Sequence, residues 1–125
     1  MVGDPTLNPL VPSPVVVASA NELASRHGVA DRCSFAVVDL DDGLPPGEPV
    51  DLIVCNMFRD ARLDQAVTAR LRPGGTLAIA ALSEVDAEPG RFRVPPGELT
   101  TAFAELDVLG AEEADGVAWL VACKQ

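Results

Sequence analysis

The sequence of 125 residues is poor in aromatic and basic side chains, and each shortage excludes a class of protein. It has no tyrosine, one tryptophan and four phenylalanines, so its core must be built mainly from Val, Leu, Ile and Ala. Nine Lys and Arg residues stand against nineteen acids, which gives a formal net charge of −10. Nucleic-acid binders need clustered Lys and Arg to displace counterions from phosphate. The composition therefore argues against nucleic acids and anionic membrane surfaces as partners.

Cysteines are also few, and long apolar runs are missing. Cys33, Cys55 and Cys123 are odd in number and widely spaced, which argues against a disulfide framework and a structural zinc site. No apolar run approaches the ~20 residues that a transmembrane helix needs. The first fourteen residues lack the basic start and apolar stretch of a signal peptide. We therefore expect a protein of the reducing cytoplasm, with no metal and no membrane contact.

The length predicts one domain, preceded by a Pro-rich segment over residues 1–13. Ser13 is a suitable N-cap for a helix that starts at Pro14, and Gly28 is a suitable C′ residue. The expected buried face of this helix consists of Val16, Ala20, Leu23, Ala24 and His27. The domain proper then covers residues 14–125.

Strands and helices alternate along the rest of the chain, which predicts right-handed βαβ units in a mostly parallel sheet. The continuous apolar character of the 50–56 strand favours a position covered on both faces. The chain ends in a pattern typical of an antiparallel hairpin. The expected elements are strands at 33–39, 50–56 and 76–82, helices at 60–71 and 97–105, a long loop at 83–97, and hairpin strands at 106–113 and 117–123.

Several segments, in this order and spacing, resemble a known family. They are the strand end Val37-Val38-Asp39-Leu40, the strand Asp51-Leu52-Ile53-Val54-Cys55, the turn Leu71-Arg72-Pro73-Gly74-Gly75 and the closing hairpin. Residues 13–124 are similar to the C-terminal two-thirds of class I S-adenosylmethionine-dependent methyltransferases, especially small-molecule types of the tellurite-resistance-like group. The resemblance implies an α/β, Rossmann-like fold, truncated at the N-terminus, and a methyltransferase-like activity on a small molecule.

The resemblance also implies where S-adenosylmethionine would bind. Asp39 and Leu40 match the residues that meet the adenine, while Cys55 and Asn56 match the strand end where methyl transfer occurs. The family's glycine-rich loop has no counterpart, and the place of the ribose-binding acid falls near Val11-Pro12. Because methyl transfer needs positioning more than acid–base groups, no catalytic residue is assigned.

Simpler interpretations of these residues stay open. Asp39 belongs to an acidic stretch that could be a solvated turn, and Asn56 could cap the turn after its strand. Arg59, Arg62, Arg91 and Arg93 could bind an anionic substrate or form weak surface ion pairs. The chain could also be a non-catalytic α/β module that pairs with a partner chain, or a fragment of a longer enzyme.

The family's strand order, 3-2-1-4-5-7-6, raises a problem of pairing. Without the first two strands, the 33–39 strand has no neighbour and the 50–56 strand has an open edge, which is costly. Three arrangements could resolve this: direct pairing of the two strands, a short strand from residues 1–12, or a second copy of the chain. We expect direct pairing or a homodimer.

Overall fold

A computed structural model of the chain describes residues 10–11 and 14–125. Most of the Pro-rich segment 1–13 therefore lies outside the described residues. The predicted Ser13 N-cap lies outside them as well. The described elements follow in chain order. They are β1 (Leu10–Val11), α1 (Pro14–Arg26), η1 (Ala30–Arg32), β2 (Ala36–Val37), η2 (Leu40–Asp42), β3 (Val50–Asn56), η3 (Ala61–Leu63), α2 (Asp64–Arg70), β4 (Leu71–Leu82), α3 (Glu98–Ala102), β5 (Asp107–Ala114) and β6 (Val117–Cys123).

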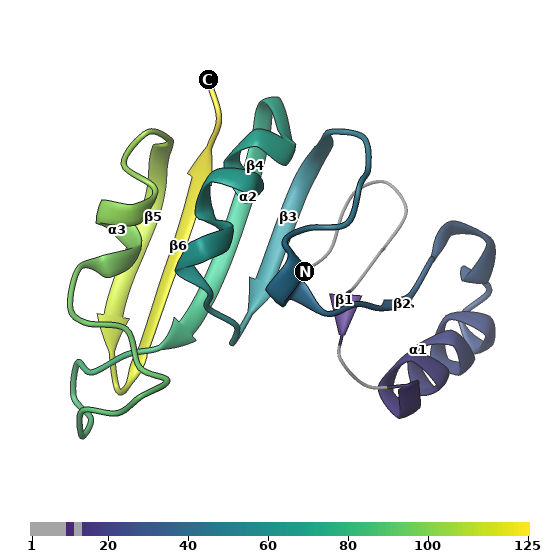
Figure 1. The fold of residues 1–125 in the computed structure, drawn as a ribbon, viewed down its shortest axis with the longest axis horizontal. Coiled ribbons are helices and arrows are strands. Elements are labelled where there is room, and N and C mark those ends of the chain that lie inside the picture. The colour runs from purple at the N-terminus through teal and green to yellow at the C-terminus, as the bar shows by residue number, and fades with distance from the viewer. Residues whose placement is uncertain (1–9, 12–13) are drawn as a thin grey trace.

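Four strands form the main sheet in the order β3-β4-β6-β5 (Figure 1). β3 and β4 are parallel, and α2 connects them. β5 and β6 form the predicted antiparallel hairpin, and β6 inserts between β5 and β4. The order of elements confirms the α/β, Rossmann-like architecture closed by a C-terminal hairpin. It also confirms the strands predicted at 50–56 and 117–123 and most of the helix predicted at 60–71.

The core lies between this sheet and the two short helices α2 and α3, which cover the same face of it (Figure 1). Leu63, Val67 and Leu71 recur at helical spacing and are all buried, as predicted. Leu99, Phe103 and Leu106 fill the other half of the layer. The sheet contributes the alternate residues of β3, β4 and β6, namely Ile53, Cys55, Leu77, Ile79, Ala81, Ala118, Leu120 and Ala122.

The opposite face of the four-stranded sheet, here called the open face, is not covered in this way. Its positions on β3 and β4 include Leu52 and Leu82, each 37% exposed, and Val54 and Ala78, which are partly buried. On β6 it includes Trp119, which is 39% exposed. The prediction that the 50–56 strand is covered on both faces is therefore wrong. Its continuous apolar run is typical of a strand that is packed on both faces. Among the described residues, only one of these faces is covered by helices.

β1, α1, η1 and β2 form a separate N-terminal lobe beside the sheet (Figure 1). Of the strand predicted at 33–39, Ala36–Val37 forms a ladder with Leu10–Val11. The helix starts at Pro14 as predicted, and the positive φ of Gly28 follows its end. Its predicted buried face is wrong: Ala24 alone is buried, and Val16 and Leu23 are about half exposed.

The two sheets share no ladder among the described residues. β2 pairs with β1 in parallel, so the prediction of direct pairing between the 33–39 and 50–56 strands is wrong. The ladder partner of β2 is instead a short strand from the first twelve residues, at Leu10–Val11. β3 keeps β4 as its ladder partner on one edge, and its other edge has none in the described part of the chain.

Candidate functional site

The carboxyl end of β3 is the natural place for a site, because parallel strands of an open α/β sheet present their ligand-binding loops there. Asn56 ends the strand and is exposed. Met57 follows in a left-handed conformation with φ 54°, which is uncommon for a residue with a side chain. The turn leaves Met57 and Phe58 with 48% and 39% of their surfaces exposed. The strand therefore ends in an amide flanked by two accessible apolar side chains.

The acidic segment after β2 lies against the segment that follows β3. Arg62 of η3 donates to Asp41 of η2 over 2.8 Å and also binds Asp60 at 2.7 Å. The hydrogen bond from Arg62 holds the pKa of the Asp60 carboxyl below its usual value. This bridge brings the predicted adenine-contact region and the predicted methyl-transfer region to one side of the molecule.

Asp39 and Leu40 have different environments. One carboxylate oxygen of Asp39, Oδ1, accepts a hydrogen bond of 2.9 Å from the backbone N–H of Asp41 and so caps η2. Its other oxygen makes no hydrogen bond to a described residue, and the side chain is exposed. Leu40 is partly buried and packs against the hydrophobic core. Asp39 thus caps its own turn, as the simpler interpretation holds, and still offers an acceptor to a ligand.

Cys55 lies on the covered face rather than at the accessible strand end. Its side chain is 4% exposed and borders a cavity of about 10 Å³ with Leu63, Val67 and Phe103. Burial raises the pKa of the Cys55 thiol, so the thiol stays protonated at neutral pH. Burial and a protonated thiol disfavour a nucleophilic role for this side chain.

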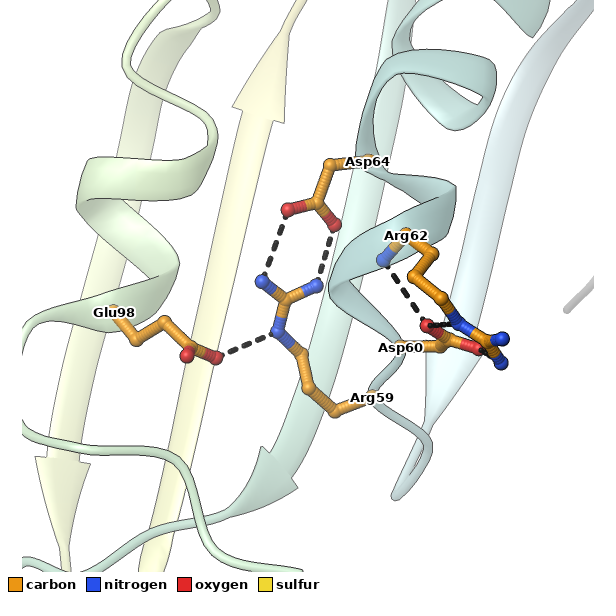
Figure 2. A network of polar contacts seen from close by, with 5 residues as sticks. All are labelled: Arg59, Asp60, Arg62, Asp64 and Glu98. Atoms are coloured by element: carbon orange, nitrogen blue, oxygen red, sulfur yellow. Dashed lines mark hydrogen bonds and ion pairs between the residues drawn. The ribbon is translucent and has the colours of Figure 1, made fainter.

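Arg59 forms a partly buried ion network next to this site, shown in Figure 2. Its guanidinium makes a two-pronged contact with the carboxylate of Asp64, and its Nε donates to Glu98 over 2.8 Å. Burial alone would lower the pKa of Arg59, but the hydrogen bonds to Asp64 and Glu98 outweigh it and raise the pKa. The side chain is 10% exposed and lies over the ring of Phe103. Arg59 therefore joins α2 to α3 and is not available to an anionic substrate.

Two further polar side chains, those of Arg93 and Ser83, hold the loop at 83–97 in place. Arg93 donates to the backbone carbonyls of Ser83 and Gly116 over 2.9 and 3.0 Å. The buried hydroxyl of Ser83 accepts from the N–H of Val85 over 3.0 Å. His27 is exposed just beyond the end of α1. None of these three side chains joins the segments at the carboxyl end of β3.

Sequence reasoning missed two hollows. The first has a volume of about 200 Å³ between α3 and the hairpin, where Glu113 accepts from the N–H of Gly97 over 2.9 Å. The second oxygen of Glu113 is buried and has no partner among the described residues. The other hollow, of about 160 Å³, lies over Val54, Ala78, Ala80 and Trp119 on the open face. Alanines alternating in a strand were a signal that could have indicated the second hollow, whereas no local pattern indicates the first.

Several solved structures have a fold similar to that of this chain. TehB from Haemophilus influenzae superposes with a TM-score of 0.83 over 98% of this chain, at 19% sequence identity. The [4+2]-cyclase SpnF gives a TM-score of 0.78 over 95% of the chain, at 17% identity. The geranyl diphosphate C-methyltransferase from Streptomyces coelicolor A3(2), in complex with Mg²⁺, geranyl diphosphate and S-adenosyl-L-homocysteine, gives 0.73 over 94%, at 12% identity. The chain has a methyltransferase-type Rossmann-like fold.

The likeness is one of structure rather than of sequence. No protein-family model matches the chain, and no curated protein matches it by sequence. The chain spans 51% of the length of TehB, 66% of SpnF and 64% of the geranyl diphosphate enzyme. About half of TehB therefore has no counterpart here. No helix in the described part of the chain is long and apolar enough to cross a membrane.

The described residues fit one end of S-adenosylmethionine better than the other. The exposed oxygen of Asp39 is an acceptor of the kind that an adenine amino group needs, and Asn56 is accessible at the end of β3. No glycine-rich segment lies next to β1 among the described residues to receive the methionine end. On the adenosine side the described residues offer one acceptor for the adenine amino group and no acid for the ribose.

Proposed function

We propose that this chain is a methyltransferase-like protein that binds S-adenosylmethionine and acts on a small molecule. The observation that supports this most is the similarity to TehB over 98% of the chain at a TM-score of 0.83. A second methyltransferase of similar fold, a geranyl diphosphate methyltransferase, is described in complex with SAM. Similarity of fold does not by itself define a reaction, and the [4+2]-cyclase SpnF illustrates this point.

In this proposal the chain's own residues position the two reactants. Asp39 accepts a hydrogen bond from the adenine amino group through its exposed oxygen, and the backbone of Leu40 contacts the ring. Asn56 and the backbone of Cys55 form the floor where the methyl group is transferred. The cofactor supplies an activated methyl group, and the protein contributes chiefly proximity and orientation. The three cysteines are all free, which is compatible with the cytoplasmic location that we also propose.

Isothermal titration calorimetry with S-adenosylmethionine and S-adenosylhomocysteine tests the proposal directly. We expect dissociation constants in the micromolar range or weaker, because the described residues offer an acceptor for the adenine but none for the ribose. The absence of measurable heat with either ligand, at protein concentrations of about 100 µM, would contradict the proposal and favour a non-catalytic module.

A pair of substitutions makes the test specific. Asp39→Asn keeps an oxygen that caps η2 but removes the carboxylate charge, and we expect it to weaken binding roughly tenfold. Asp42→Asn makes the same chemical change three residues away, in the same acidic turn. It should leave binding unchanged. Equal affinities for the two variants would show that Asp39 does not contact the ligand.

A further inference from the structure

The hollow between α3 and the β5–β6 hairpin has apolar walls and an opening to solvent. Leu99, Ala111 and Ala118 are among its lining residues, and so are the exposed Thr100 and Glu112. Its volume is about 200 Å³. An apolar cavity of about 150 Å³ admits a benzene molecule, and a single water needs only about 10–15 Å³. The hollow therefore has room for a molecule with one six-membered ring.

Glu113 supplies a carboxylate at this hollow that is only half satisfied. Its Oε2 accepts a hydrogen bond of 2.9 Å from the backbone N–H of Gly97. Its Oε1 is buried and has no partner among the described residues. A buried carboxylate oxygen without a partner has lost its water and gained nothing in return, which is costly. The last torsion of a glutamate turns easily, so a donor that enters the hollow can be met by Oε1.

The other polar groups of the hollow are acceptors as well. Oγ1 of Thr100 donates its only proton to the carbonyl of Gly97 over 3.0 Å, so its lone pairs are left for a donor. Glu112 adds a second negative charge. No Lys, Arg or His is found among the described residues that line the hollow. A complementary ligand therefore carries a positive charge and donates hydrogen bonds.

The state of Glu113 also indicates which kind of cation fits. A guanidinium or amidinium binds best as a fork that uses both carboxylate oxygens, and Gly97 already occupies one of them. A primary ammonium is compact and has three donors, so it needs only one oxygen from each acceptor. Glu113 and Thr100 offer one such oxygen each. The apolar walls then favour a hydrocarbon ring next to the ammonium group.

We propose that this hollow binds a small primary amine in its protonated form, with a hydrocarbon ring against Leu99, Ala111 and Ala118 and the ammonium group on Glu113. The strand order β3-β4-β6-β5 puts β5 three strand spacings, or about 14 Å, from β3. The hollow is thus separate from the residues proposed to hold S-adenosylmethionine. The inference does not depend on the proposed methyltransferase function.

Two-dimensional ¹H–¹⁵N NMR of the full chain, titrated with benzylammonium to about 20 mM, tests this proposal. A ligand of this size with one charged contact should bind with a dissociation constant of about 1 mM. We expect saturable shift changes at the backbone amides of Gly97, Thr100 and Glu113, and none at Asn56. Benzyl alcohol has the same ring without the charge and should bind at least tenfold more weakly.

Three variants locate the contact. Glu113→Gln keeps an acceptor for Gly97 but removes the charge, and should weaken binding of benzylammonium at least tenfold. Glu105→Gln removes the same charge from an exposed residue that does not line the hollow, and should leave binding unchanged. Ala111→Leu fills the hollow and should abolish the saturable shifts. Circular dichroism shows whether each variant is folded.

The titration of the wild-type chain decides the proposal even if a variant does not fold. The absence of saturable shifts would show that the hollow holds water alone and would overturn the proposal. Equal binding of benzyl alcohol, or shift changes centred away from Gly97 and Glu113, would do the same. Binding that is unchanged in a folded Glu113→Gln variant would contradict the assigned role of the carboxylate.

Discussion

At the scale of single residues, two arginines three positions apart differ in what surrounds them. The side chain of Arg59 is 10% exposed and neutralises two carboxylates, whereas that of Arg62 is 65% exposed. Removing one partner of a buried pair leaves an uncompensated charge. We expect Arg59→Met, which keeps the apolar stem over Phe103, to lower the free energy of unfolding by about 2–3 kcal/mol. Urea denaturation measures this change.

Arg62→Met is the matched control, because it removes the same charge from a guanidinium that is 65% exposed and pairs with Asp41 and Asp60. Exposed pairs are screened by water and salt, so its effect on unfolding should be small and should vanish at high ionic strength. Equal destabilisation by the two substitutions would show that the Arg59 network does not join α2 to α3 in solution.

Cys55 provides a pH-dependent prediction at the same scale. Its folded-state pKa is raised by burial, so the folded chain holds the thiol proton to higher pH than the unfolded chain does. The contribution of Cys55 to stability is therefore intact below the unfolded pKa of about 8.5 and declines as the pH rises above it. Cys55→Ala should flatten the loss of stability between about pH 8.5 and pH 10, as followed by urea denaturation. An unchanged slope would mean that the thiol is accessible.

At the scale of elements, the turn that precedes the central part of β4 contains two glycines with different roles. Gly74 has a φ of +86° and open space around it, so Gly74→Ala meets backbone strain of about 1 kcal/mol. A Cβ on Gly75 would lie 2.8 Å from the carbonyl oxygen of Arg72 and 3.1 Å from that of Val50. Neither backbone can move without disturbing the pairing of β3 with β4.

We therefore expect Gly75→Ala to cost more than Gly74→Ala, about 2–3 kcal/mol, as overpacking against a rigid backbone does. Thermal unfolding followed by circular dichroism compares the two variants under identical conditions. The reverse order would indicate that the β3–β4 ladder begins later along the chain than the pairing of Val50 with Leu71 implies.

Helices and strands were predictable where the spacing of apolar residues within the element is enough to identify its buried face. The spacing of Leu63, Val67 and Leu71 predicts a buried helix face, and the hairpin at the end of the chain follows from its apolar strands and the turn between them. The face of α1 was not predictable in the same way. Its apolar spacing is genuine, but what covers it depends on segments that sequence periodicity does not identify.

The same distinction applies to the site. The acid at position 39 and the amide at position 56 are predicted site residues because each lies at the end of a recognisable strand in a known order. The partly buried pair between Arg59 and Glu98 could not be predicted, because it joins residues 39 positions apart in the sequence. The unpartnered oxygen of Glu113 likewise depends on how α3 meets the hairpin. Long-range contacts of this kind arise from packing and leave no local signal.

At the scale of the whole molecule, two sheets of unequal size share one chain. β4 has ladder partners on both sides, and the core cluster lies over it. In the N-terminal lobe the β1–β2 ladder is two residues long, and α1 buries Ala24 alone among its described side chains. Burial of apolar surface provides most of the stabilisation of a fold. The N-terminal lobe therefore has far less of this stabilisation than the main sheet.

This difference predicts that the lobe opens independently of the main sheet. Hydrogen exchange measured by mass spectrometry should show amides of α1 exchanging within seconds to minutes, while those of β4 and β6 exchange only through global unfolding. Leu40 and Leu44 pack against the core and should mark where protection begins. If α1 were protected as strongly as β4, contacts of the lobe with the rest of the chain would have to supply a stability that its buried surface does not account for.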